Sequence, residues 1–347
     1  MKIGIITVFA VPNYGAMLQS YALCSYLKQQ GHKAEIIDYR QPDLTELYRF
    51  RRKFPPALKH WFRLRKCASF VNRCIPRSKR HYHSVETLLH NVEDYDCLIT
   101  GSDQVWFTGP VQYYDPFFFL DFPSVRARKV SYSASAGGVE SFDPFAERVR
   151  KALAGFSHIG VRDSHTASLV KGLTEKAVTE TVDPTFLVDF EELHLASQPE
   201  NDPYIVVFGN FNATPSIIEE VRQSTGIKTI VSLQYPCAAA TTRIASPSPV
   251  DWLHWIRHAS FVVTSYFHGT ALAVHYARPF IAIPTPGRLV KVKTLLAPLG
   301  LSARCIDNPG LGEAGELAAQ DIDWREVKRL LGGRIQESKS FLQRALS

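Results

Sequence analysis

The chain of 347 residues is too long for one ordinary hydrophobic core, so we expect two domains. Its apolar share of 45% and charged share of 21% are typical of a soluble globular protein, and no apolar run reaches the roughly 18 residues of a membrane span. The six cysteines form no CxxC pair and no metal-binding spacing, which argues against a zinc centre and favours reduced thiols in the cytoplasm.

The formal charge of +7 is concentrated in residues 47–85. This segment holds twelve Lys and Arg residues and no acidic residue, and without these cations the chain would carry −5. Nucleic-acid binding by the whole chain is therefore not expected. Because Trp61, Phe62, Leu64 and Phe70 are interleaved with the cations, the segment could lie on an anionic membrane surface or meet a lipid-linked diphosphate. A solvated pair of basic helices is the alternative interpretation.

The first half of the chain alternates strands and helices, which predicts a parallel sheet. Strands are expected at residues 2–9, 33–40, 95–102, 128–137 and 157–164, and helices at 16–30, 144–154 and from Asp163 or Ser164 to about 173. The helix at 16–30 is apolar nearly all round, so we expect it to be buried between neighbours. Residues 47–85 interrupt this alternation like an insertion.

A second alternation follows a polar, turn-rich linker at residues 194–203. Strands are expected at 204–210, 228–235, 260–265 and 279–284, helices at 215–225, 249–259, 270–277, 288–300 and 323–346, and a loop at 236–249. We therefore predict two doubly wound, Rossmann-like α/β domains, residues 1–195 and 196–322, facing a cleft. Residues 323–347 form a last helix that packs back on the first domain. In such sheets ligands bind at the carboxyl ends of the strands.

The stretch TSYFHGT, residues 264–270, joins a predicted buried strand to a helix. Backbone N–H groups at the start of a helix, together with the helix dipole, form an anion site. Gly269 lets the backbone approach a ligand closely, and His268 places a titratable imidazole beside it. A His that only packs or caps the helix is the alternative.

Three further turns are expected at strand ends. They are Asn13-Tyr14-Gly15, Gly101-Ser102-Asp103-Gln104 and Arg162-Asp163-Ser164. Each has a structural alternative, which is shaping a turn, capping a helix or pairing with a nearby carboxylate. Together with His268 they suggest a small anionic substrate and acid–base chemistry. The absence of GxGxxG, GxxxxGK[ST] and GxSxG argues against a dinucleotide site, a P-loop and an α/β-hydrolase.

The ordered set of motifs resembles the polysaccharide pyruvyl transferase family. The set comprises NYGAMLQSYAL, GSDQVW, DPFFFLDF, KVSYSASAG, GVRDS, VDPTFLV and ASFVVTSYFHGTALAV followed by RPFIAIP, with GSDQVW and FHGT the most specific. It covers the chain from the first strand to about residue 310. The resemblance implies a fold similar to two-domain glycosyltransferases of the B type (GT-B), an enzyme with phosphoenolpyruvate as donor substrate and no cofactor, and a sugar hydroxyl pair as acceptor.

The product implied by the resemblance is a cyclic pyruvate ketal, formed with release of phosphate. We expect His268 to bind phosphate and move a proton, and Asp103 to orient or deprotonate the acceptor hydroxyl. We expect Arg162 to hold the donor's carboxylate or phosphate. The other substrate-binding residues expected are Asn13, Tyr14, Gly15, Gly101, Ser102, Gln104, Ser265, Gly269, Thr270 and Arg288.

The central turn departs from the family pattern. Many members carry Arg-Leu-His where this chain has Tyr266, Phe267 and His268, so one donor-binding cation is missing, and Arg288, Lys291 and Lys293 are the candidates to replace it. Two other functions stay open: a GT-B glycosyltransferase that uses a nucleotide sugar, and a non-catalytic relative that keeps the cleft. If the acceptor sugar is carried on a polyprenyl diphosphate, the basic segment would act at the inner membrane face.

Overall fold

The computed structural model describes residues 1–40, 58–82, 84, 87–88, 95–109, 114–122, 126–193, 202–211 and 215–347. The chain forms two compact units. The first contains Met1–Pro55, Phe70–Asp189 and Gly332–Ser347, and the second contains Pro56–Ser69 and Phe190–Leu331. The boundary expected between residues 195 and 196, and most of the linker around it, lie outside the described residues.

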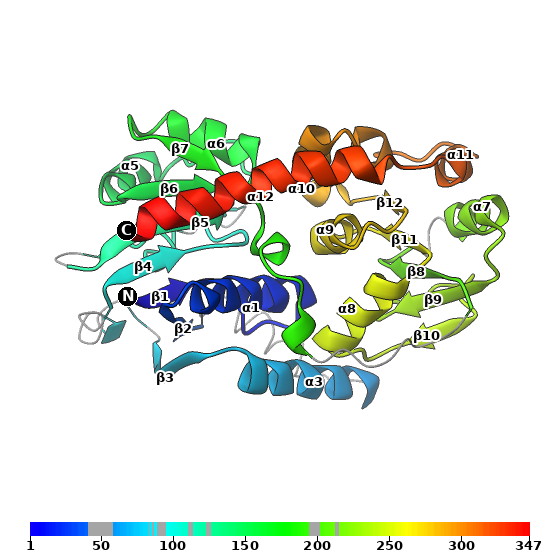
Figure 1. Cartoon of the computed structure of the whole chain (residues 1–347), viewed down its shortest axis with the longest axis horizontal. Coiled ribbons are helices and arrows are strands. Elements are labelled where there is room, and N and C mark those ends of the chain that lie inside the picture. The colour runs from blue at the N-terminus through cyan, green and yellow to red at the C-terminus, as the bar shows by residue number, and fades with distance from the viewer. Residues whose placement is uncertain are drawn as a thin grey trace. The chain divides into compact units, whose positions relative to one another are not determined.

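The first unit is built on a seven-stranded parallel sheet with the strand order β3-β2-β1-β4-β5-β6-β7 (Figure 1). The strands are β1 (Lys2–Ile6), β2 (Lys33–Tyr39), β3 (Arg77–Tyr82), β4 (Cys97–Thr100), β5 (Arg128–Ala134), β6 (His158–Val161) and β7 (Val178–Glu180). The order reverses between β1 and β4. Ligands of doubly wound sheets bind beside such a reversal, at the carboxyl ends of the strands.

The helices of the first unit follow their strands closely. They are α1 (Tyr14–Gln29), α5 (Ala146–Ala154) and α6 (Ser164–Lys171), with short 3₁₀ turns at Pro184–Phe186 (η2) and, at the start of the second unit, at Glu191–Leu193 (η3). Asn13 caps α1, because its side-chain oxygen accepts hydrogen bonds from the backbone N of Gly15 (3.1 Å) and Ala16 (3.3 Å). Thirteen of the sixteen residues of α1 are buried, which confirms the prediction of an enclosed helix.

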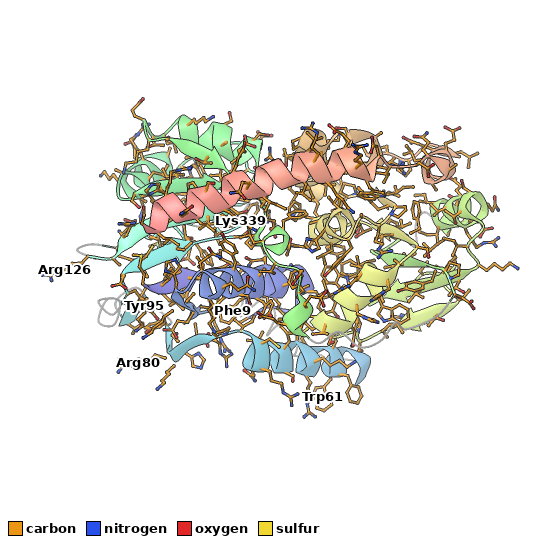
Figure 2. All side chains as sticks on the ribbon, viewed as in Figure 1. Phe9, Trp61, Arg80, Tyr95, Arg126 and Lys339 are labelled. Atoms are coloured by element: carbon orange, nitrogen blue, oxygen red, sulfur yellow. The ribbon has the colours of Figure 1, made fainter. Side chains whose placement is uncertain are left out.

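The last helix, α12 (Trp324–Leu346), begins in the second unit and ends in the first. Its Ser338 hydroxyl accepts a hydrogen bond from the backbone N of Val182 (2.9 Å), and Lys339 Nζ lies 5.8 Å from the ring centroid of Tyr26 (Figure 2). Gly160 of β6 makes this packing possible, since a Cβ there would come within 2.9 Å of the Phe341 ring. The first unit is therefore completed by the end of the chain.

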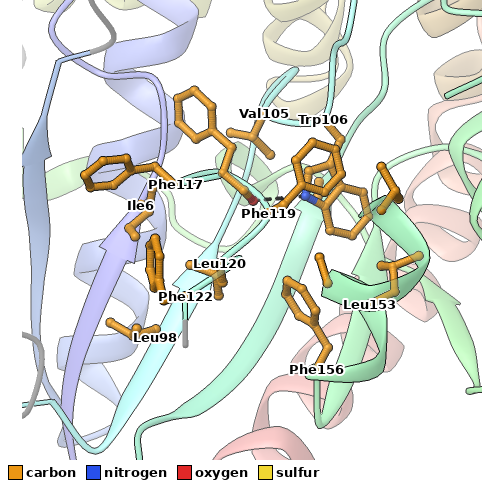
Figure 3. Packing of buried hydrophobic residues seen from close by; sticks show 14 of the residues in the cluster. Ile6, Leu98, Val105, Trp106, Phe117, Phe119, Leu120, Phe122, Leu153 and Phe156 are labelled. Carbon is orange, nitrogen blue, oxygen red and sulfur yellow. Dashed lines mark hydrogen bonds between the residues drawn. The ribbon is translucent and has the colours of Figure 1, made fainter. Parts of the chain in front are cut away.

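The segment after β4 is an aromatic core rather than a surface loop. Trp106 stacks on Phe119, with ring centroids 5.8 Å apart, and its indole N–H donates to the backbone oxygen of Phe118 (3.0 Å; Figure 3). Phe117, Phe118, Phe119, Leu120 and Phe122 are all buried in one cluster with Trp106. Close packing of this kind fixes the backbone of the turn that precedes it.

The second unit has a five-stranded parallel sheet with the order β10-β9-β8-β11-β12. Its strands are β8 (Tyr204–Phe208), β9 (Thr229–Leu233), β10 (Thr242–Ile244), β11 (Phe261–Thr264) and β12 (Phe280–Ala282). Its helices are α7 (Pro215–Thr225), α8 (Pro249–His258), α9 (Phe267–His275), α10 (Pro286–Leu296) and α11 (Glu313–Ala319), with 3₁₀ turns at Ala297–Leu299 (η4) and Ser302–Arg304 (η5). The order reverses between β8 and β11, so β11 ends at the position where such sheets bind ligands.

The predicted fold class is confirmed, and one local prediction is wrong. The expected loop at 236–249 contains β10, in which Thr242 pairs with Val231 of β9. The basic segment, where it is described, forms the helix α3 (Leu58–Cys74), followed by the edge strand β3, and most of the rest of it lies outside the described residues. The sequence RSKRHY of β3 has no apolar alternation, because an edge strand needs only backbone pairing with β2.

Candidate functional site

The first candidate region is the turn that follows β4. Gly101 has a φ of +111°, and a Cβ at this residue would lie 2.1 Å from the backbone oxygen of Tyr132, so only glycine fits. Asp103 has a φ of +76°, and its backbone oxygen accepts a hydrogen bond from the N–H of Ser135 (3.0 Å). The neighbouring strand therefore holds this turn in place and fixes the direction of the Asp103 side chain.

Arg162, directly after β6, connects two carboxylates at this edge of the sheet. Its Nη1 lies 3.6 Å from Oδ1 of Asp103 and 3.5 Å from Oδ2 of Asp183. The Ser102 hydroxyl donates to the same Asp183 oxygen (3.3 Å). The side chains of Arg162 and Asp183 are 2% and 0% exposed, and that of Asp103 is 13% exposed. The structure thus brings together three predicted residues, Ser102, Asp103 and Arg162.

Asp183 is a member of this group that the sequence analysis did not select. Its Oδ1 accepts hydrogen bonds from the backbone N (3.1 Å) and the hydroxyl (2.8 Å) of Thr185, so it also caps η2. The motif VDPTFLV contains the only available signal, an Asp that lies three residues after the end of β7 in the same sheet. Distances between strands of a parallel sheet cannot be obtained from spacing along the chain.

The charges of this group determine which ligands it can take. With both carboxylates ionised, Asp103, Asp183 and Arg162 sum to −1, which disfavours a further anion nearby. The most accessible of them, Asp103, also accepts a hydrogen bond from the backbone N of Gln104 (2.9 Å). A carboxylate held in this way can accept a hydrogen bond, or a proton, from a neutral hydroxyl group.

The turn after β1 reaches this region through residues that were not predicted. Thr7 donates a hydrogen bond from its hydroxyl to the backbone oxygen of Ser102 (2.8 Å), and the side-chain N of Gln19 donates to that hydroxyl (2.9 Å). The predicted Asn13 and Gly15 instead take part in capping α1, and Tyr14 is buried at the start of that helix. Asn13 therefore has a structural role as the cap of α1, and substrate binding by this turn stays a prediction.

Two other predicted residues have structural partners in the first unit. The Gln104 amide packs against Gly137, where a Cβ would come within 2.2 Å of Nε2. Asp163 caps α6, accepting from the backbone N of Thr166 (2.7 Å), and also accepts from the Ser135 hydroxyl (2.7 Å). These contacts hold the loops after β4, β5 and β6 against one another.

The second candidate region is the turn from β11 into α9. The helix begins at Phe267, three residues earlier than expected, so His268 lies in its first turn and is 8% exposed. Gly269 is required here, because a Cβ would come within 2.3 Å of the Thr264 hydroxyl. The Ser265 side chain lies against Gly209 at the end of β8, where a Cβ would meet its oxygen at 2.5 Å.

The early start of α9 corrects one predicted donor. The backbone N of Thr270 donates to the oxygen of Tyr266 (3.0 Å), so this N–H belongs to the helix and cannot serve a ligand as expected. The N–H groups of the first turn of α9 are those of Phe267, His268 and Gly269. The predicted anion site therefore shifts by one residue toward the end of β11.

Beside this helix start lies a cluster of aromatic rings that contacts the guanidinium group of Arg288. The guanidinium carbon of Arg288 lies 4.2 Å from the ring centroid of Tyr266, a cation–π arrangement. Tyr266 stacks with Tyr235, with centroids 5.8 Å apart and planes at 18°, and the two hydroxyls are hydrogen-bonded to each other. Phe208 supports the Tyr266 ring with a centroid distance of 4.8 Å. Tyr266 carries no charge itself, but its ring holds the cationic side chain of Arg288 in place.

Two arginines act on this aromatic group. Burial raises the pKa of Tyr235, the hydrogen bond between its hydroxyl and that of Tyr266 raises it further, and the charges of Arg63 and Arg288 lower it. Of the three residues expected to replace the missing cation, Arg288 lies on Tyr266 itself, whereas Lys293 pairs with Asp307 (3.4 Å). Arg63, on the buried side of α3, was not predicted, because its sequence neighbours suggested a solvated helix.

Two further properties concern the described residues as a whole. Within the described ranges, no three His, Cys, Asp or Glu side chains are grouped so that they could hold a metal ion. Likewise, no helix in the described part of the chain has both the length and the hydropathy of a membrane span.

Comparisons with known proteins identify both a family and a fold. A family model described as polysaccharide pyruvyl transferase matches residues 13–286. No curated protein sequence matches significantly. The structure of UDP-GlcNAc 2-epimerase from Neisseria meningitidis, bound to UDP-GlcNAc, has a TM-score of 0.57 and 10% identity, covering 99% of this chain and 100% of that chain. UDP-GlcNAc 2-epimerase from Methanocaldococcus jannaschii has a TM-score of 0.54 and 10% identity, with coverage of 96% and 99%. At this identity the similarity shows the fold alone, two Rossmann-like domains of the GT-B class.

Proposed function

Because the chain belongs to the polysaccharide pyruvyl transferase family, we propose that it transfers the enolpyruvyl group of phosphoenolpyruvate to a sugar of a surface or capsular polysaccharide, or of its lipid-linked precursor. One observation carries the proposal beyond the family. The two sheets end in groups of opposite character, a carboxylate cluster at Asp103 and a cationic helix start at His268 and Arg288. Ketal formation needs both kinds of group.

The reaction balances as follows. A proton is added to the methylene carbon C3 of phosphoenolpyruvate, and C2 becomes an oxocarbenium-like electrophile. One sugar hydroxyl loses its proton and forms a bond to C2, and the bond between C2 and the phosphate oxygen breaks. The second hydroxyl then loses its proton and forms the second C2–O bond, so that a cyclic ketal and phosphate result; the two hydroxyl protons balance the one added to C3 and the one taken up by the phosphate. The chain must supply an acid, a base and donors for two anionic groups.

We assign the anionic donor to the second unit. The helix start of α9 offers the N–H groups of its first turn to an anion, and Arg288 adds a full positive charge beside them. His268, in the same turn, can bind the phosphate and move a proton. Because Tyr266 holds Arg288 through its ring, the residue that replaces the family's arginine still contributes to donor binding.

We assign the acceptor hydroxyl to Asp103 of the first unit. Its carboxylate is the accessible end of a network that Arg162 and Asp183 complete. The net charge of −1 makes this cluster a poor site for phosphoenolpyruvate, so we propose a positioning role for Arg162 in place of the direct donor contact expected from the sequence. Arg162 would hold the Asp103 carboxylate in the orientation needed to accept the proton.

Calorimetry with phosphoenolpyruvate, and separately with UDP, tests the donor class. We expect phosphoenolpyruvate to bind to the wild-type protein, and Arg288→Ala to weaken this binding about tenfold or more, as for loss of a charge-assisted contact. Arg243→Ala is a matched control, since Arg243 lies on the neighbouring edge strand β10 and donates to the Gln234 oxygen. Binding of UDP that phosphoenolpyruvate does not affect would overturn the proposal in favour of a nucleotide-sugar transferase, and binding of neither would contradict it.

A further inference from the structure

Helix α3 has two faces of different character. Arg63, Cys67, Phe70 and Val71 recur at helical spacing and are buried. The opposite face is exposed and carries Trp61, Phe62, Arg65, Lys66 and Arg73. The buried face accounts for the attachment of the helix to the protein, but it does not account for the aromatic residues on the outside.

Trp61 and Phe62 form an exposed aromatic pair on the outer face. They are 42% and 46% exposed, and their rings meet edge to face with centroids 5.2 Å apart. Only six large apolar side chains are exposed among the described residues, and these two are adjacent. Figure 2 shows Trp61 projecting outward from the ribbon of α3. Exposing two large rings side by side is unfavourable unless they meet an apolar medium.

Within α3 itself, the charge around the aromatic pair has a single sign. Residues 58–74 contain five Lys and Arg residues and no Asp or Glu. The guanidinium carbon of Arg65 lies 4.7 Å from the Trp61 ring centroid, so this cation and the indole occupy one patch. Lys66 lies 3.4 Å from Asp251 of α8, but both side chains are about half exposed, and a pair of that kind is weak and can exchange partners.

We propose that the outer face of α3 binds the surface of an anionic lipid bilayer. Trp and Phe rings favour the boundary between head groups and acyl chains, and Arg and Lys reach the phosphates while their stems cover apolar surface. The negative surface potential of an anionic membrane attracts every exposed cation of the helix, and each cation adds to the binding affinity. A specific protein partner would require acidic groups in a matching pattern, whereas a bilayer requires only a negative surface.

Sedimentation of the full chain with lipid vesicles tests this inference. We expect binding to vesicles of mixed phosphatidylglycerol and phosphatidylcholine, and little binding to phosphatidylcholine alone. The double variants Trp61→Ser/Phe62→Ser and Arg65→Glu/Lys66→Glu should each weaken binding roughly tenfold or more. Raising the salt concentration should weaken the wild type and the aromatic variant, which keeps its cations, more than the charge variant.

Two controls and a second readout keep the test specific. Leu311→Ser removes an apolar side chain that is 95% exposed elsewhere, and Lys171→Glu reverses an exposed charge on α6, so both should bind vesicles like the wild type. Phosphoenolpyruvate binding should be unchanged in all these variants, which separates this inference from the proposed reaction. Absence of vesicle binding by the wild type, or equal loss in the α3 and control variants, would overturn the proposal.

Discussion

The carboxyl ends of the two sheets are held by different physical means. In the first unit, charged and hydroxyl side chains are buried and bound to one another, with Asp103, Asp183, Arg162 and Ser102 in one network. In the second unit, stacked aromatic rings support a single cation, Arg288, at the edge of the helix start. The first arrangement couples function to folding, because no member can be removed without leaving a buried charge or hydroxyl uncompensated.

The second arrangement leaves function and folding largely separate. The rings of Phe208, Tyr235 and Tyr266 pack whether or not Arg288 is present, so a change in the cation should affect ligand affinity more than stability. Variants in the first region should therefore lose mainly stability, and variants in the second region should lose mainly ligand affinity.

The largest expected effect on the reaction is at His268. His268→Gln keeps a polar side chain of similar size but cannot shuttle a proton, so phosphate release should fall about 10²- to 10⁴-fold. The urea midpoint should stay close to that of the wild type. His32→Ala, which removes an imidazole from the first unit, should leave activity unchanged. Activity of His268→Gln within a few-fold of the wild type would remove this residue from the mechanism.

The largest expected effect on stability is at Arg162. Arg162→Ala leaves two carboxylates near each other without their cation, and breaking a buried pair costs about 3–5 kcal/mol. The matched control is Arg257→Ala, which breaks a partly exposed pair with Glu191 (2.6 Å) and should cost at most about 1 kcal/mol. Urea unfolding measures both. Equal losses in the two variants would show that the network is not a buried, coupled one.

The pH dependence of unfolding gives a second measure for the first unit. Burial raises the pKa of Cys97 on β4 from 9.0 to about 12, an effect that Arg128 opposes and Asp96 increases. Above pH 9 the unfolded chain loses this proton while the folded chain keeps it. The free energy of unfolding should therefore fall by about 1.4 kcal/mol per pH unit between pH 9 and the folded pKa. Cys97→Ser should remove this contribution to the pH dependence. If the free energy of unfolding falls equally steeply with pH in the wild type and in Cys97→Ser, the raised pKa of Cys97 is contradicted.

The smallest expected effect is at Tyr266. Tyr266→Leu removes the ring under Arg288, and loss of a cation–π contact of about 0.5–2 kcal/mol should weaken phosphoenolpyruvate binding about 2- to 30-fold. Tyr266→Phe keeps the ring and loses only the hydrogen bond to Tyr235, so its affinity should stay nearer to that of the wild type. If calorimetry finds the two variants equally weak, the hydroxyl pair and not the ring positions the cation.

Features that depend on neighbours along the chain were predictable from the sequence. The alternation of strands and helices, the Asp163 cap and the helix at Ser248-Pro249 all follow from local preferences. In the structure, Ser248 and Asp251 form the reciprocal cap that such a helix start favours. Gly269 was predicted to let a ligand approach the backbone, and the structure adds a second requirement, because a Cβ there would come within 2.3 Å of the Thr264 hydroxyl.

Features that depend on contacts across the sheets could not be predicted. Asp183 meets Arg162 only because β6 and β7 pair in parallel, and Arg63 reaches the surroundings of Tyr235 only because α3 packs through that face. The edge strands β3 and β10 are short and polar, so their formation depends on the strand beside them rather than on their own residues.

The passage of α12 from the second unit into the first has a consequence for recombination and protein engineering. Arg128 of β5 donates to the backbone oxygens of Ala345 and Ser347, both at 2.7 Å, so the first unit uses the last residues of the chain. Neither unit is encoded by one continuous stretch of the gene. An exchange between relatives at a single crossover near residue 190 would therefore pair the first sheet with a foreign terminal helix and the second sheet with a foreign Pro56–Ser69 segment, and no single crossover would transfer a complete unit.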